Sequence, residues 1–206
     1  MDIAVNLVEN YLRLTGYLTL SEFEVQTRDK KGRYKTVTDI DVMAVRFPGA
    51  LYIDEPDEHK QNILIDDPVL ELLDDCVDVI IGEVKQGQAQ LNDGIRDHAA
   101  LFAMLHRIDW LYGDDVAVTE VIVGLQRSGL HLASARGGGR VRTRLVAFGR
   151  SDHSDLATIS LSHIVTTMLG FFHRYEDAFR PINFKEPAPA FLRLLLKAGF
   201  EIEDIR

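Results

Sequence analysis

The sequence predicts an α/β fold in which helices flank a mixed central β-sheet. Three observations support this prediction. Apolar residues recur at helical spacing over residues 2–15, they alternate at strand spacing over 36–47, and they form an almost continuous run over 77–85. The full order of predicted elements is α-β-β-β-α-β-β-α-α, and such an order is typical of a sheet that carries helices on both faces.

The first predicted element is a helix over residues 2–15. At about 100° per residue, Ile3, Leu7 and Tyr11 share one face of this helix. Gly16 follows at the position where glycine commonly ends a helix. The amphipathic pattern predicts that the helix packs against the sheet.

Two strands and an irregular segment are expected next. Residues 22–26 lead into a turn at 29–32, and the chain returns through the β-branched run TVTDIDVMAVRF at 36–47. Residues 48–75 are polar, acidic and irregular, apart from a short helix predicted around 69–73. We therefore interpret this segment as an acidic insertion.

The second half of the chain completes the predicted sheet and its helices. A central strand is expected at 77–85, a helix at 91–107, strands at 117–125 and 141–148, and helices at 157–179 and 189–198. Three successive glycines at 137–139 predict the tip of a hairpin between the last two strands.

The composition is that of an ordinary globular protein. Of 206 residues, 46% are hydrophobic and 27% are charged, which excludes a disordered or low-complexity chain. No apolar run reaches the roughly 18 residues that cross a bilayer, and acids precede the first arginine, unlike in a signal or transit peptide. A single cysteine, Cys76, excludes a disulfide framework and a cysteine-rich zinc site. We expect a cytoplasmic protein with no membrane partner.

Charge is distributed unevenly along the chain. The net charge is −9, but six of the 23 basic residues lie from Arg127 to Arg150 with no acidic residue among them, so the rest of the chain carries −15. Over residues 54–83, eleven Asp or Glu accompany one Lys. The overall acidity argues against nucleic-acid binding, whereas the separation provides one region suited to a cation and another suited to phosphate.

Charged side chains gather at the end of the predicted central strand. Glu83 and Lys85 are two residues apart and therefore project from the same face, and Asp39 and Asp41 share a face of the preceding long strand. If these strands pair, two carboxylates and one ammonium meet. Buried carboxylates need compensation, and hard oxygen ligands suit Mg²⁺ or Mn²⁺. A lysine beside such an ion has the reach to orient or deprotonate an attacking water, which is the chemistry of phosphodiester hydrolysis.

Glu9 on the first helix, TDID at 38–41 and GEVK at 82–85 together resemble the PD-(D/E)XK nuclease superfamily, including Mrr-like endonucleases and junction resolvases. The resemblance implies a restriction-endonuclease-like αβββαβ core over 1–150, which contains the acidic insertion. It further implies that Asp41 and Glu83 ligate Mg²⁺ or Mn²⁺, that Lys85 serves the nucleophilic water, and that Glu9 assists. Asp39 is the alternative to Asp41 as ligand. Residues 151–206 would form a C-terminal helical extension packed on the core.

Arginines on a later strand form a second candidate site. Arg140, Arg142 and Arg144 alternate with apolar or neutral residues and thus share one face, and Arg136 stands just before the glycines. Because no acid lies near them in the sequence, we interpret the four as a nucleic-acid-binding surface that contacts phosphate. The alternative is an edge strand protected by charge.

The function predicted from these patterns is that of a Mg²⁺-dependent endonuclease acting on DNA. A first alternative is a catalytically silent nuclease-fold module that binds nucleic acid or a partner protein. A second is an interaction subunit, because the C-terminal helices carry Phe171, Phe172, Phe179 and the run FLRLLL at 191–196, which suits either a dimer or partner face or closure of the core.

Overall fold

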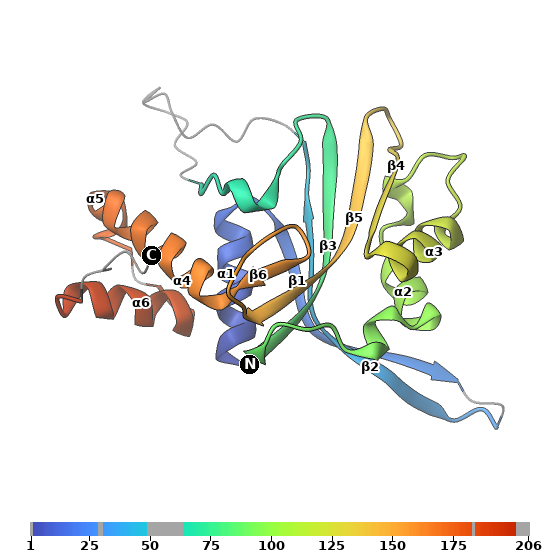
Figure 1. Ribbon diagram of the computed structural model, residues 1–206, viewed down its shortest axis with the longest axis horizontal. Helices are drawn as coiled ribbons and strands as arrows, with labels where there is room; N and C mark the ends of the chain where they lie inside the picture. Colours follow the sequence, from blue (N-terminus) through green and yellow to red (C-terminus); the bar gives the residue numbers. More distant parts are fainter. Residues whose placement is uncertain (1, 29–30, 49–63, 183, 201–206) are drawn as a thin grey trace.

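The computed structural model describes residues 2–28, 31–48, 64–182 and 184–200. Within these residues, six strands form one mixed sheet in the order β1-β2-β3-β5-β4, with β6 beside β5 (Figure 1). The strands are β1 (Leu18–Arg28), β2 (Tyr34–Arg46), β3 (Cys76–Gln88), β4 (Leu130–Ser134), β5 (Arg140–Arg150) and β6 (Thr158–Ser160). The helices are α1 (Ile3–Leu14), α2 (His98–Leu105), α3 (Val118–Ser128), α4 (Leu161–Arg174), α5 (Glu176–Phe179) and α6 (Pro187–Lys197).

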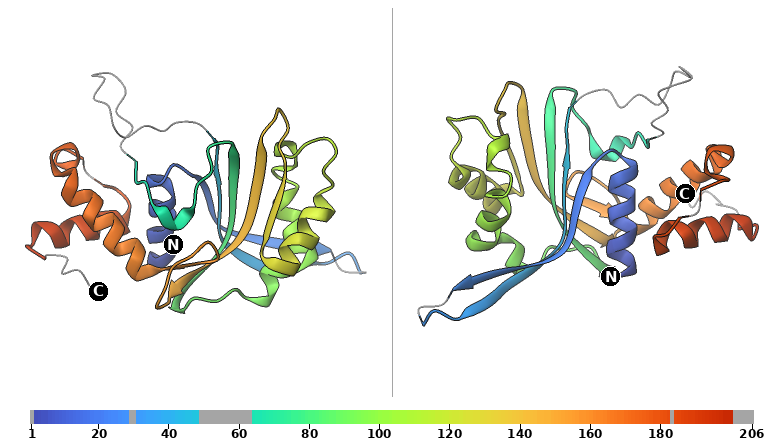
Figure 2. Two further views of the ribbon diagram at one scale, coloured as in Figure 1. Left: turned by 45° about the horizontal axis from the view of Figure 1, so that its top comes forward. Right: turned by 180° about the vertical axis from the view of Figure 1, so that it is seen from behind.

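The first three strands are antiparallel, and β3 then runs parallel to β5. Helices cover both faces of the sheet: α1 and α4 lie on one face with α6 packed against them, and α2 and α3 lie on the other (Figures 1 and 2). Each face has its own hydrophobic cluster. The predicted α/β class with a mixed, helix-flanked sheet is therefore confirmed. None of the described helices is long and apolar enough to span a bilayer.

Local sequence explains where α1 begins and ends. The Asp2 carboxylate accepts a hydrogen bond from the Ala4 amide at 2.7 Å and thus caps the first turn. Tyr11 and Leu12 are completely buried against the sheet. Gly16 has a φ of 92°, a conformation that favours glycine and ends the helix. The helix predicted over residues 2–15 is confirmed.

The strand predicted at 117–125 is wrong, because this segment forms α3. Its β-branched residues suggested a strand, but Val121, Ile122 and Leu125 are buried at helical spacing whereas Val123 is exposed. Gly129, with a φ of 74°, then ends the helix. The partner of β5 in the hairpin is β4, and the glycines at its tip all have positive φ.

Three other predicted elements differ from the structure in detail. The helix expected at 91–107 is divided into a 3₁₀ helix, Asp93–Arg96, and α2. The helix expected at 157–179 begins with β6 before α4 and α5. Most of the predicted insertion, residues 49–63, lies outside the described residues, and its later part contains a 3₁₀ helix at Pro68–Leu70.

A buried ion-pair network joins β3 to β5. The Asp78 carboxylate of β3 accepts hydrogen bonds from Arg142 at 2.5 Å and from Arg144 at 2.9 Å, and both arginines belong to β5. The Tyr17 hydroxyl also donates to Asp78 at 2.5 Å. Burial opposes ionisation of Asp78, but the charges of Arg144 and Arg142 outweigh it and lower the pKa of the carboxyl.

The remaining guanidinium donors of the network attach two loops to the sheet. Arg142 donates to the carbonyls of Leu70 and Glu71 at 2.9 Å each, and Arg144 donates to the carbonyl of Leu156 at 2.8 Å. Arg144 is only 1% exposed. Because buried charges need both pairing and hydrogen bonds, these contacts allow two arginines to lie inside the fold.

Replacing Arg144 by methionine should lower the free energy of unfolding by about 3–5 kcal/mol, because it deprives the buried Asp78 carboxylate of one of its two cationic partners. Urea denaturation measures this loss. Arg140 is the matched control: it lies on the same strand, but its pair with Asp75 is exposed, so Arg140→Met should change stability little. Equal losses in the two variants would contradict a special role for the Asp78 network.

Acid should destabilise the wild-type protein more than the Arg144→Met variant. Since the pKa of folded Asp78 lies below its ordinary value of 3.8, its ionised form contributes stability that is fully present above that value. This contribution is lost as the pH falls through the lower, folded pKa. The pKa is depressed less in the variant, so less stability is lost there. Urea denaturation from about pH 2 to 6 tests this, and parallel pH profiles would refute it.

Candidate active site

The candidate site lies where β2 leaves β3. Backbone pairing of these strands extends to Val42 and Gly82. Immediately beyond this pair, the Asp41 carboxylate accepts a hydrogen bond from the Val84 backbone amide at 2.7 Å. A side chain of β2 thus takes the place of a backbone acceptor for this amide of β3. Gly82 is required here, because an added Cβ would lie 2.7 Å from side-chain atoms of both Val42 and Phe148. The glycine thus allows close strand packing directly before the charged residues.

Glu83 and Lys85 extend the cluster on the face covered by α2 and α3. Glu83 is only 2% exposed, and one of its carboxylate oxygens forms an ion pair with the Lys85 ammonium. The other oxygen accepts a hydrogen bond from the side-chain amide of Asn92 at 2.7 Å. Asn92 is itself fixed, because its side-chain oxygen accepts from the Ile95 amide at 2.8 Å and caps the following 3₁₀ helix.

The charges of Glu83 and Lys85 both act on Asp41. Burial raises the pKa of the Asp41 carboxyl, and the negative charges of Glu83 and Asp2 add to this, whereas the hydrogen bond from the Val84 amide and the charge of Lys85 oppose it. The hydrogen bond to Glu83 raises the pKa of Lys85. The Lys85 ammonium therefore interacts with two carboxylates, Glu83 and Asp41, and the cluster has an excess of negative charge that a cation would relieve.

The structure does not bring Glu9 to this cluster. Its buried carboxylate accepts hydrogen bonds from Arg13 at 2.5 Å and from Thr19 at 3.0 Å. The acidic residue beside α1 whose charge acts on Asp41 is instead Asp2. Asp2 lies about 10 Å from Glu9 along the helix axis, at 1.5 Å per residue. The predicted assistance from Glu9 stays a prediction, and the contacts of its side chain are those of a structural residue.

Three residues near the cluster were not identified from the sequence. Asn92 fixes Glu83, Asp2 adds negative charge, and Gln86 donates to Asp2 at 2.9 Å. Asn92 and Asp2 carry the signal of helix capping, a polar side chain immediately before a helix, but this signal does not show what else the side chain contacts. Gln86 follows Lys85 directly and carries no comparable pattern.

The structure also distinguishes the two candidate aspartates of β2. Asp39 lies opposite Glu24 in the pairing with β1, and its side chain is exposed. Asp41 is half-buried and bonded to β3. Asp41 is therefore the residue that shares a site with Glu83.

The donor chemistry of the cluster suits a hard divalent cation. Among the described residues, no group of three or more His, Cys, Asp and Glu side chains is arranged to hold a metal ion. Mg²⁺ usually keeps several waters and needs only one or two carboxylates, so Asp41 and Glu83 are a sufficient protein contribution. Their surplus negative charge, noted above, fits such an ion.

All four arginines predicted to contact phosphate pair with acids from distant segments. The pairs are Arg136 with Asp114 at 2.7 Å, Arg140 with Asp75 at 2.6 Å, Arg142 with Asp78 at 2.5 Å and Arg144 with Asp78 at 2.9 Å. The premise that no acid pairs with them is wrong. Because Arg142 and Arg144 are buried, this strand face is not a phosphate-binding surface. Phosphate contact by the exposed Arg136 and Arg140 stays a prediction.

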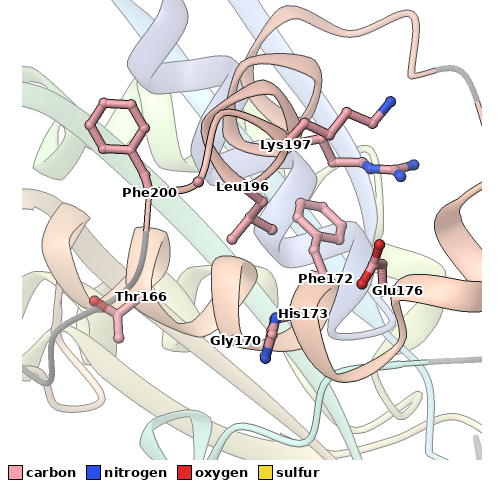
Figure 3. A pocket seen from close by; sticks show the side chains of 10 residues that line it. Thr166, Gly170, Phe172, His173, Glu176, Leu196, Lys197 and Phe200 are labelled. Carbon is pink, nitrogen blue, oxygen red and sulfur yellow. The ribbon is translucent and has the colours of Figure 1, made fainter.

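A pocket of about 670 Å³ lies between α4 and α6, away from the cluster (Figure 3). Its lining includes Phe172, His173, Glu176 and Lys197, and none of the predicted site residues. Phenylalanines 171, 172 and 179 are buried and close the core, as one of the two interpretations expected. The same region exposes the side chains of Phe191 and Leu194, so a dimer or partner contact there stays a prediction.

Comparisons with models of known protein families, with curated proteins and with solved structures found no match to this chain. The assignment of a function therefore depends on the geometry of the site.

Proposed function

We propose that the chain is a Mg²⁺-dependent nuclease of the PD-(D/E)XK type that hydrolyses phosphodiester bonds of DNA. The observation that carries this proposal is the meeting of Asp41, Glu83 and Lys85 where β2 diverges from β3. The order of α1, β1, β2, β3, the helices α2 and α3, and then β5 parallel to β3 supports a restriction-endonuclease-like core.

The proposed roles follow from the surroundings of each side chain. Asp41 and Glu83 would hold Mg²⁺, with Asp41 oriented by the Val84 amide and Glu83 by the Asn92 amide. A bound Mg²⁺ would supply Lewis acidity toward a phosphoryl oxygen and acidify a water. The described chain thus contributes two oriented carboxylates. The site carries more negative than positive charge, so a cation would be attracted to it.

Lys85 is suited to a role beside the ion rather than as its ligand. Its side chain is 38% exposed and its ammonium pairs with Glu83. This pairing raises the pKa of Lys85, so the group is charged at neutral pH. A charged lysine donates hydrogen bonds. It would therefore orient the attacking water or stabilise the negative charge on phosphate, and proton abstraction is the less favoured role.

Replacing Lys85 by alanine should reduce Mg²⁺-dependent cleavage of plasmid or oligonucleotide DNA by at least about a hundredfold, while the fold and metal binding survive. The reason is that the ammonium acts on water or phosphate and not on the ion. Initial cleavage rates and calorimetric Mn²⁺ titration measure the two effects. Lys197→Ala, which removes an exposed lysine elsewhere, is the control. Cleavage by Lys85→Ala at the wild-type rate would exclude this mechanism.

Metal affinity should separate ligands from neighbouring residues. Glu83→Gln and Asp41→Asn should each nearly abolish Mn²⁺ binding, because each removes a charged oxygen ligand. Asn92→Ala should weaken binding by about 10–100-fold, since the amide only orients Glu83. Asp39→Asn is the matched control for Asp41→Asn and should bind Mn²⁺ normally. The same affinity loss in both aspartate variants would show that the ion is not held at Asp41.

A further inference from the structure

The hairpin of β1 and β2 extends beyond the layered body of the protein as a two-stranded ribbon (Figures 1 and 2). Val25 and Ile40 are the outermost of its buried residues, and the pairing register shifts between Val25 and Gln26. Beyond this shift, residues 26, 28 and 31–36 are all exposed. We define residues 26–28 and 31–36 as the basic arm.

The arm reverses the charge of the chain. Residues 26–36 contain five basic side chains and one acidic side chain, a net charge of +4 in a chain of net charge −9, so the rest carries −13. The described basic residues of the arm are Arg28, Lys31, Arg33 and Lys35. The acids of β1 and β2, which are Glu22, Glu24, Asp39 and Asp41, all lie outside the arm, closer to the body of the protein.

Packing does not account for the arm. A two-stranded ribbon without a buried face is only marginally stable, so this extension gains little from the fold. Tyr34 is 72% exposed, and the Arg28 guanidinium lies 5.8 Å from the centroid of its ring. Arg28 also donates to the Gly32 carbonyl at 3.0 Å. These contacts fix a cation and an aromatic ring on an exposed element that packs against no hydrophobic core.

We infer that the basic arm binds the phosphate backbone of duplex DNA and holds it across the candidate site, an inference that rests on the proposed function. The arm and the site belong to one strand: Lys35 is six residues from Asp41 on β2, which is about 20 Å at 3.3 Å per residue. At 3.4 Å per base pair, the arm contacts the duplex about six base pairs from the site.

Shape and charge both favour a duplex as the occupant. A two-stranded ribbon fits the major groove of B-form DNA, which is about 12 Å wide, and phosphates border that groove on both sides. The −13 on the rest of the chain repels a polyanion, so the arm provides the favourable approach. Because Arg142 and Arg144 are buried and cannot contact phosphate, the arm is the better candidate for the main nucleic-acid surface.

The test is duplex binding by a Lys31→Gln, Arg33→Gln, Lys35→Gln triple variant. Fluorescence anisotropy with a labelled duplex of about 20 base pairs is measured in EDTA, which prevents cleavage, between about 50 and 200 mM salt. Each lost phosphate contact lowers the slope of log K against log salt by about 0.9, so the triple variant should lose up to about 2.7 in slope and about tenfold or more in affinity.

The matched control removes three cations at the other end of the molecule, with Arg174→Gln, Arg180→Gln and Lys185→Gln combined. Arg174 ends α4, Arg180 follows α5 and Lys185 lies just before α6, and these helices are remote from the arm (Figure 1). The control should keep the wild-type slope. Equal losses in both triple variants would assign the effect to net charge and overturn the inference. Tighter binding of a single strand than of the duplex, or no DNA binding by the wild-type protein, would also overturn it.

Cleavage assays separate this inference from the proposed function. If the arm variant binds DNA like the wild type while the wild-type protein cleaves, the inference fails and the nuclease proposal stands. If the wild-type protein binds DNA through the arm but never cleaves with Mg²⁺ or Mn²⁺, the nuclease proposal fails and the arm remains a DNA-binding element.

Discussion

The buried carboxylate of Asp78 is the interaction on which the arrangement of the sheet depends. It joins β3 to β5 through Arg142 and Arg144, and Tyr17 adds the turn between α1 and β1. Parallel strands have no hairpin to set their register, so a charge pair between two specified positions can set it. Removing one partner of a buried pair is far more costly than the net stability the pair provides. We therefore regard the network mainly as a determinant of which residues face each other.

The register that Asp78 sets also fixes the candidate site. Asp78 and Glu83 are five residues apart on β3 and consequently project from opposite faces of the sheet. On one face the Asp78 carboxylate is neutralised by two arginines, and this pairing stabilises the sheet. On the other face Glu83 meets one lysine and a second carboxylate, Asp41, so its charge is incompletely compensated. The same strand thus separates structural charge from charge available for chemistry.

Sequence patterns predicted the helices and strands wherever one period dominated, as in α1 and β3. They failed at α3, because β-branched residues and helical spacing conflicted there and the helix depended on burial of Val121 and Leu125. They located Asp41, Glu83 and Lys85 from spacing and strand order. They missed Asn92, whose role depends on a contact across a turn, and misassigned the arginines. The separation of 66 positions between Asp78 and Arg144 explains the latter error, since local sequence does not show which distant acid neutralises a basic strand.

One change of direction connects the site to the arm. When β2 leaves β3 beyond Val42, the Val84 amide donates its hydrogen bond to the Asp41 carboxylate instead of to a backbone carbonyl of β2, which places that carboxylate beside Glu83. The same divergence frees the outer half of the hairpin from the sheet, so its side chains are not selected for packing. A continuous sheet would have paired both regions and used them for stability. The divergence of β2 from β3 therefore both concentrates negative charge at Asp41 and places the positive charge of the basic arm away from the sheet. A cation bound at Asp41 would attract a polyanion at the site, and the arm would attract it at the other end of the hairpin.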